Sequence, residues 1–148
     1  VGLAESIAMI GSRLGWELDS IEDRIEPLIA ETPVTSGTVR VAAGQVRGLR
    51  QLGHGHENGR SRVRLEFLAA VGEGQDFDEV EIQGHPDLRS RIEGGIHGDI
   101  ATASITVNTI PRVATARPGL LSMADLPPAA CLPSHPAPPR QGPSSPGG

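Results

Sequence analysis

Residues 62–69 read Arg62-Val63-Arg64-Leu65-Glu66-Phe67-Leu68-Ala69, and they carry the clearest structural signal in the chain. In an extended chain, successive side chains point to opposite faces. Here the apolar side chains share one face: Val63, Leu65, Phe67 and Ala69. The charged side chains share the other face: Arg62, Arg64 and Glu66. This alternation predicts a β-strand with one face on a core and the other in water.

A hairpin is expected to lead into this strand, because a cluster of turn-forming residues precedes it. The cluster consists of Gly53, Gly55, Asn58 and Gly59. The outgoing arm would hold Val39, Val41 and Ala43 in alternation, and Gly44 and Gly48 indicate bulges or close backbone approach. A further strand is expected from Glu79 to Gln83, with Val80 and Ile82 on one face.

Helices are expected on both sides of this β region. The apolar residues of the first have helical spacing: Leu3, Ile7, Ile10 and Leu14, with Gly15 as a stop signal. Residues 16–31 repeat the pattern less clearly, Pro27 disfavours helix, and residues 28–30 suggest a short strand. Residues 99–116 predict a long helix that is capped by Asp99 and kinked or divided by Pro111.

This order of elements predicts an α+β domain over residues 1–126. Its sheet is expected to be open, mostly antiparallel or mixed, with about four strands packed against helices and with a long C-terminal helix. Residues 127–148 contain eight of the 13 prolines and little to bury, which predicts a disordered proline-rich tail. The strings Pro133–Pro136 and Pro143–Pro146 fit a PxxP ligand, although a solvated tail that binds nothing is the favoured interpretation.

Composition excludes several classes of function. All 13 basic residues are arginine, so this chain has no lysine for a Schiff base or a P-loop. The net charge of −5, with both signs interspersed, disfavours nucleic acid as a partner, and no apolar run has the length of a membrane span. The single cysteine, Cys131, and an N-terminus without a basic segment favour a cytoplasmic location. Val1 in place of methionine suggests processing or a fragment.

Two short patterns of glycine and histidine are weak candidates for ligand binding. The string Gly53-His54-Gly55-His56 lacks the third glycine of a dinucleotide fingerprint and falls in the expected turn, so no cofactor site is predicted in this chain. His54 and His56 could share a metal ion, with Glu57 as the obvious neighbour. A metal site needs further ligands, however, and a solvated turn without metal is the favoured interpretation.

The candidate substrate site lies in the segment of residues 84–99. The pair Gly94-Gly95 precedes a helix, where backbone N–H groups and the helix dipole favour an anion. Arg89 suits bidentate binding of a carboxylate, and His97 can donate a hydrogen bond beside the start of the helix. The alternative interpretation is that this segment binds no ligand. Asp99 would then be an ordinary helix cap, and the arginines would be solvated. The residue types identify no catalytic residue.

Three strings in this part of the chain form a familiar series. They are Gly94-Gly95-Ile96-His97-Gly98-Asp99-Ile100-Ala101-Thr102-Ala103, Val107-Asn108-Thr109-Ile110-Pro111 and Pro118-Gly119-Leu120-Leu121-Ser122-Met123-Ala124-Asp125-Leu126-Pro127. Residues 81–86 and 41–48 fit the same pattern. In this order the strings resemble the dihydrodipicolinate reductase-like group, and within it the 2,4-diaminopentanoate dehydrogenase type. The resemblance covers residues 3–127.

The resemblance implies a two-domain enzyme in which a Rossmann domain binds NAD or NADP. This chain would be the α+β domain that binds a small amino-acid-like or cyclic imine substrate and forms a homo-oligomer. The implied reaction is hydride transfer at a carbon that bears an amine, or reduction of a C=N or C=C bond. The chain lacks the Rossmann half and the His- and Lys-containing catalytic segment of dihydrodipicolinate reductases, so it is expected to be inactive alone. The alternative is a non-catalytic module that oligomerises or binds a small acid.

Overall fold

The computed structural model describes residues 2–130. The chain divides into two compact units, Val1–Gly95 and Ile96–Gly148. The elements are α1 (Leu3–Leu14), β1 (Ser20–Ile29), β2 (Val34–Ser36), β3 (Val39–Val41), β4 (Val46–Glu57), β5 (Arg60–Ala70), β6 (Phe77–Ile82), β7 (Leu88–Glu93) and α2 (Gly98–Thr115). Helices and antiparallel strands confirm the α+β class. From residue 131 onward, the predicted disordered tail lies outside the described residues.

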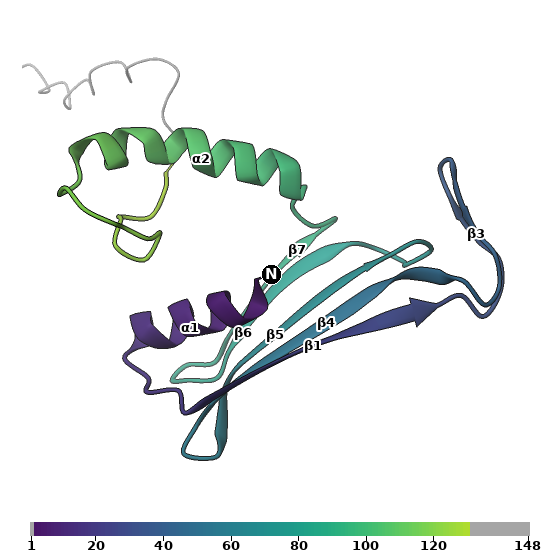
Figure 1. The fold of residues 1–148 in the computed structure, drawn as a ribbon, viewed down its shortest axis with the longest axis horizontal. Coiled ribbons are helices and arrows are strands. Elements are labelled where there is room, and N and C mark those ends of the chain that lie inside the picture. Colours follow the sequence, from purple (N-terminus) through teal and green to yellow (C-terminus); the bar gives the residue numbers. More distant parts are fainter. Residues whose placement is uncertain (1, 131–148) are drawn as a thin grey trace, which may run out of the picture. The chain divides into compact units, whose positions relative to one another are not determined.

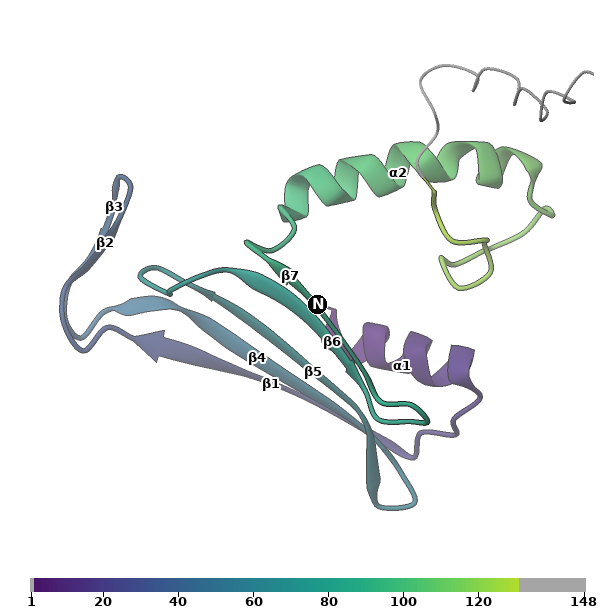
Figure 2. The ribbon, with the colours of Figure 1, turned by 180° about the vertical axis from the view of Figure 1, so that it is seen from behind.

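The central sheet of the first unit has the strand order β1-β4-β5, and both pairings are antiparallel. In Figure 1 and Figure 2, β4 lies between the other two strands and β1 forms the outer edge. The strand predicted around residues 62–69 is confirmed as β5. Its partner is β4, however, because Val39–Val41 pairs with Val34–Ser36 to form a separate small hairpin.

The helical pattern predicted for residues 16–31 is wrong, because β1 is a strand over all of Ser20–Ile29, and the short strand suggested at residues 28–30 overlaps the end of this longer strand. Ile21 and Ile25 are four residues apart, a spacing that suits either one face of a helix or one face of a strand. Their partners on β4 are Gly55 and Gln51. This backbone pairing shows that the segment is a strand and not a helix. Pro27 is compatible with this strand because β1 lies at the edge of the sheet, where a missing backbone N–H group is tolerated.

The predicted turn at Gly53 and Gly55 is also wrong, since both residues lie inside β4. The turn consists of Asn58 and Gly59, whose φ angles of 53° and 72° are left-handed. Two left-handed residues match the twist of a two-residue hairpin connection. Gly53 and Gly55 instead leave room for helix α1 on the sheet.

Helix α1 packs on one face of the central sheet (Figure 1). Ile7 is fully buried there, and a Cβ on Gly53 would lie 2.7 Å from Ile7 Cδ1. The side chain of Ile7 therefore occupies the space that side chains on β4 would need. The predicted close approach at Gly48 is confirmed as well, because a Cβ there would collide with the backbone of Ala69 and Ala70.

The expected single sheet of about four strands is wrong for the described residues, which form three separate antiparallel sheets. The second sheet is the β2–β3 hairpin and the third is the β6–β7 hairpin. Strand β7 was not predicted, because residues 84–99 were considered only as a candidate ligand-binding segment that precedes a helix. The register of the third sheet pairs Glu79 with Arg91 and Glu81 with Arg89.

The second unit contains α2, which continues through Pro111 without being divided. The helix begins at Gly98, so its N-cap residue is His97 and not the predicted Asp99, which lies in the first turn. After the helix, the chain makes a turn in which Asp125 Oδ2 accepts hydrogen bonds from the backbone N–H and the hydroxyl of Ser122, both at 2.8 Å. Among residues 2–130, neither helix has the length and apolar character needed to cross a membrane.

Candidate functional site

The β6–β7 hairpin carries the predicted arginine and has two different faces. One face is charged and combines Glu79 and Glu81 of β6 with Arg89, Arg91 and Glu93 of β7. The other face is apolar and exposed, and it combines Val80, Ile82, Leu88 and Ile92. The alternation of β7, with Leu88, Ser90 and Ile92 on one side, is the sequence signal that could have identified this strand.

Arg89 already binds a carboxylate of its own chain. Its Nε and Nη2 atoms donate hydrogen bonds of 3.0 and 2.8 Å to Glu79 Oε2, and its Nε lies 3.3 Å from Glu81 Oε1. The hydrogen bond from Arg89 holds the pKa of Glu79 below its ordinary value, and Glu79 in turn raises the pKa of Arg89. A substrate carboxylate would have to displace Glu79 to bind the same guanidinium.

Arg91 is the second arginine on this face, and sequence reasoning gave it no role beyond solvation. Its guanidinium carbon lies 3.7 Å from the centre of the Phe77 ring, a cation–π contact. Its Nε donates a 2.7 Å hydrogen bond to Glu93 Oε1, and its Nη1 lies 3.5 Å from Glu79 Oε2. Arg91 therefore stabilises the hairpin itself.

Gly94 and Gly95 follow directly after β7 and have φ angles of 81° and 65°. This left-handed conformation explains why glycine occupies both positions. The backbone N–H of Gly94 donates to Asp76 O at 2.8 Å, and that of Gly95 donates to Ile92 O at 3.3 Å. Both donors that were predicted for an anion are thus used within the first unit.

The structure does not bring Arg89 and the two glycines together. They lie at opposite ends of β7, with five residue steps between Arg89 and Gly94 in an extended strand. At about 3.4 Å per residue, the two positions are roughly 17 Å apart. A single carboxylate cannot contact both, so the predicted site separates into two places on the first unit.

His97 belongs to the second unit, at the start of α2. Its side chain makes no capping hydrogen bond, while its backbone oxygen accepts from the N–H of Ala101 at 2.9 Å. The first N–H groups of a helix have no partner within the helix, and they favour an anion together with the helix dipole. Asp99 in the first turn already supplies one negative charge at this helix end.

The two weak histidine candidates, His54 and His56, lie on β4 and not in a turn. Both point away from α1, and their rings stack with centres 6.0 Å apart and planes inclined by 20°. Within residues 2–130, no group of three or more His, Cys, Asp or Glu side chains is arranged to hold a metal ion. The pair therefore belongs to the polar face of the sheet, where Arg64 is paired directly with His54.

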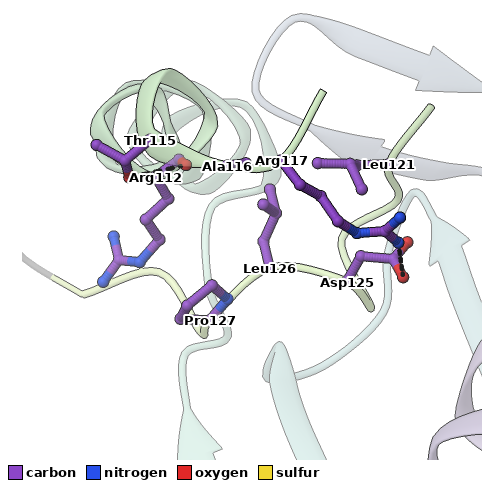
Figure 3. A pocket seen from close by; sticks show the side chains of 8 residues that line it. All are labelled: Arg112, Thr115, Ala116, Arg117, Leu121, Asp125, Leu126 and Pro127. Atoms are coloured by element: carbon purple, nitrogen blue, oxygen red, sulfur yellow. Dashed lines mark hydrogen bonds and ion pairs between the residues drawn. The ribbon is translucent and has the colours of Figure 1, made fainter. Parts of the chain in front are cut away.

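A cavity of about 340 Å³ lies within the second unit, where the chain after α2 folds back toward the end of the helix (Figure 3). The cavity is lined by Arg112, Thr115, Ala116, Arg117, Leu121, Asp125, Leu126 and Pro127. Figure 3 shows the side chain of Leu126 between those of Arg112 and Arg117. Arg112 donates a 2.7 Å hydrogen bond to Asn108 O, and Arg117 lies 4.0 Å from Asp125. The polar groups of the cavity are thus engaged within the unit.

Comparison with known proteins agrees with this fold. The model of the family "2,4-diaminopentanoate dehydrogenase C-terminal domain" matches residues 1–137, which extends past the predicted domain end at residue 126. A 2,4-diaminopentanoate dehydrogenase of Acetoanaerobium sticklandii is 33% identical over an alignment of 132 residues, and the match covers 86% of this chain and 37% of that protein.

Among solved structures, an amine dehydrogenase from Mycobacterium smegmatis matches with a TM-score of 0.68 and 28% identity, over 84% of this chain and 38% of that one. The chain therefore spans well under half the length of these two relatives. Because the family model matches residues 1–137, which include all the described residues, the chain belongs to the family of 2,4-diaminopentanoate dehydrogenase C-terminal domains.

Proposed function

We propose that this chain is the substrate-side domain of an NAD(P)-dependent oxidoreductase that acts at an amine-bearing carbon of a small amino-acid-like molecule. The observation that carries the proposal is the family match over residues 1–137. The names of the two relatives, a diaminopentanoate dehydrogenase and an amine dehydrogenase, support the substrate class. A cytoplasmic location is part of the same proposal, in keeping with a single cysteine.

The cofactor belongs to a different part of the enzyme in this proposal. A Rossmann fold binds NAD(P) at the turn between a parallel strand and a helix. All strand pairs in the described residues are antiparallel, and Gly53-His54-Gly55 lies inside β4 beneath α1. These residues do not fit a dinucleotide, so this chain's contribution is to bind and orient the substrate.

His97 is the first choice for the substrate contact. It stands beside the helix end that favours an anion, its side chain makes no capping hydrogen bond, and an imidazole can donate to a carboxylate near neutral pH. Arg89 is the second choice, because its guanidinium is paired with Glu79 and Glu81. Gly94 and Gly95 shape the chain that leads from β7 to α2.

The test is a chimaera in which residues 1–137 replace the matching region of the Acetoanaerobium sticklandii enzyme. We expect oxidation of 2,4-diaminopentanoate with reduction of NAD(P)⁺. His97→Ala should lower kcat/KM by roughly ten- to a hundredfold, the value of one charge-assisted hydrogen bond. His85→Ala, in the connection between β6 and β7, is the matched control and should leave kcat/KM unchanged.

Arg89→Ala in the same chimaera separates the two candidate contacts. A rise in KM with this variant alone assigns the carboxylate to the β6–β7 hairpin. If both the His97→Ala and the Arg89→Ala variants keep the wild-type kcat and KM, the segment of residues 84–99 has a structural role only. A folded chimaera without any dehydrogenase activity favours the alternative of a non-catalytic module.

A further inference from the structure

The connection between β4 and β5 is the two-residue turn Asn58-Gly59, which lies between the paired residues Glu57 and Arg60. Both turn residues are exposed, and a Cβ at Gly59 would meet nothing within 4 Å. The chain has two asparagines, and Asn58 is the one that precedes a glycine. An exposed asparagine before glycine is chemically labile, because no side chain shields the backbone nitrogen that follows it.

We propose that Asn58 is a site of spontaneous deamidation, and that the carboxylate of Asp19 holds the turn in a conformation that slows this reaction. Water is the co-reactant, and no enzyme or cofactor is needed. Asp19 acts in this proposal as a positioning residue, through the backbone of the turn. The inference does not rest on the proposed dehydrogenase function, because the turn lies outside the segment of residues 84–99.

The reaction begins when the backbone nitrogen of Gly59 attacks the Cγ atom of Asn58. A bond forms between these two atoms, the bond from Cγ to Nδ2 breaks, and Nδ2 leaves as ammonia with the proton that the backbone nitrogen gives up. Water then opens the cyclic succinimide. Opening at Cγ gives aspartate, and opening at the backbone carbonyl carbon gives isoaspartate, in which the main chain runs through Cβ and Cγ. The net change replaces an amide by a carboxylate, without oxidation or reduction.

The backbone conformation of the turn opposes the first step. Asn58 and Gly59 have φ angles of 53° and 72°, so both residues are left-handed. In the left-handed region ψ is about +47°, which places the nitrogen of the next residue almost opposite Cβ about the Cα–C bond. From that position the nitrogen of Gly59 cannot reach Cγ of Asn58. The turn must therefore open, and ψ of Asn58 must rotate, before the ring can close.

Hydrogen bonds tie this turn to the connection between α1 and β1. The N–H of Asn58 donates to Asp19 Oδ2 at 2.5 Å, and the N–H of Asp19 donates to His56 O at 2.9 Å. Next to them, the N–H of Glu17 donates to Glu57 Oε1 at 2.8 Å. The bond from Asn58 acts directly on the residue whose backbone must rotate, and its charged acceptor makes it stronger than a neutral hydrogen bond. Without the carboxylate of Asp19, the turn should open more often.

Deamidation would loosen the same tie between the turn and residues 17–19. Either product places a new carboxylate beside that of Asp19, and like charges at short distance repel each other. Isoaspartate also lengthens the main chain of a turn whose two left-handed residues match the twist of the flanking strands. The modified turn should therefore lose its hydrogen bond to Asp19, and the neighbouring hydrogen bond from Glu17 to Glu57 should weaken.

The experiment is incubation of the 148-residue chain over weeks, at neutral and at mildly alkaline pH. Trypsin releases Asn58 in the peptide of residues 51–60 and Asn108 in the peptide of residues 92–112. Mass spectrometry and labelling by isoaspartyl methyltransferase should find the modification in the first peptide and not in the second. The rate should rise with pH, because the nitrogen of Gly59 must lose its proton. Asn58→Gln is the control and should stay unlabelled, whereas an unmodified Asn58 in the wild type overturns the proposal.

Asp19→Ala tests the protective role of the carboxylate. It should raise the rate of deamidation by about two- to tenfold, the value of one exposed hydrogen bond. Glu22→Ala removes an exposed carboxylate from β1 and should leave the rate unchanged. A wild-type rate in Asp19→Ala, or equal acceleration by both variants, overturns the role of Asp19.

The wild type in urea decides the matter if Asp19→Ala fails to fold. Unfolding should raise the rate at Asn58, because the turn no longer holds this residue in the left-handed conformation. Equal rates in the folded and the unfolded chain would show that the turn does not slow the reaction, and would overturn the proposal.

Discussion

Ile7 of α1 lies so close to Gly55 of β4 that a Cβ on Gly55 would come within 2.6 Å of Ile7 Cγ2. Ile7 is fully buried, and Leu18 closes the same space from another side, with its Cδ1 atom 3.0 Å from the position of that Cβ. The glycine is therefore part of the interface between helix and sheet. This contact fixes where α1 sits on the first unit.

Gly55→Ala should destabilise the first unit by about 1–3 kcal/mol, because overpacking forces α1 or β4 to shift. The measurement is the free energy of unfolding in urea. Gly74→Ala is the matched control, since a Cβ there meets nothing within 4 Å. Equal stability of the two variants would show that α1 is free to adjust.

Ile7→Ala should lower the free energy of unfolding by about 2–5 kcal/mol, because it removes a buried side chain and leaves a cavity. Met9→Ala on the same helix should cost much less, since Met9 is 41% exposed. Thermal or chemical unfolding of both variants gives the comparison. A small effect of Ile7→Ala would mean that α1 contributes little to the stability of the sheet.

Glu79→Gln should make the stability of the β6–β7 hairpin less dependent on pH. Its hydrogen bond from Arg89 keeps the pKa of Glu79 below the ordinary value of 4.5. A carboxylate with a lowered folded pKa stabilises the folded state above its unfolded pKa, and this contribution is lost as the pH falls through the folded pKa. The wild type should thus exceed Glu79→Gln in stability near neutral pH, with the difference vanishing in acid.

The measurement for Glu79 is hydrogen exchange or unfolding of both proteins between neutral pH and acid. Glu31→Gln removes the same charge outside the hairpin and serves as the control. A difference between wild type and Glu79→Gln that persists at low pH would contradict the assigned ion pair.

The chain alone should bind neither NADH nor NADPH in a saturable manner. Its strands pair only antiparallel within residues 2–130, so no parallel strand–turn–helix unit is available to hold the pyrophosphate. Calorimetric titration or nucleotide fluorescence measures this directly, with a complete dehydrogenase as the positive control. Saturable micromolar binding would require a dinucleotide site of another kind.

The sequence by itself determined the features that depend on local pattern. The alternation in residues 62–69 predicted β5, the apolar spacing from Leu3 to Leu14 predicted α1, and the order of elements predicted the α+β class. The strings from Gly94 onward indicated the family that the comparisons confirm. Each of these signals lies within a short stretch of chain, so no distant contact is needed to interpret it.

Tertiary structure alone decided which glycines turn the chain and which charged side chains are paired with one another. The local sequence around Gly55 is typical of a turn. In the structure, however, Ile7, 48 positions earlier in the chain, occupies the space that a side chain at Gly55 would need. From the sequence, the guanidinium of Arg89 is available to bind the carboxylate of a substrate. In the structure, the pairing of β6 with β7 brings Glu79 to it, and the two side chains form an ion pair. Both outcomes depend on contacts between residues that are separated in sequence, and local propensity contains no information about the partner that a strand or helix will meet.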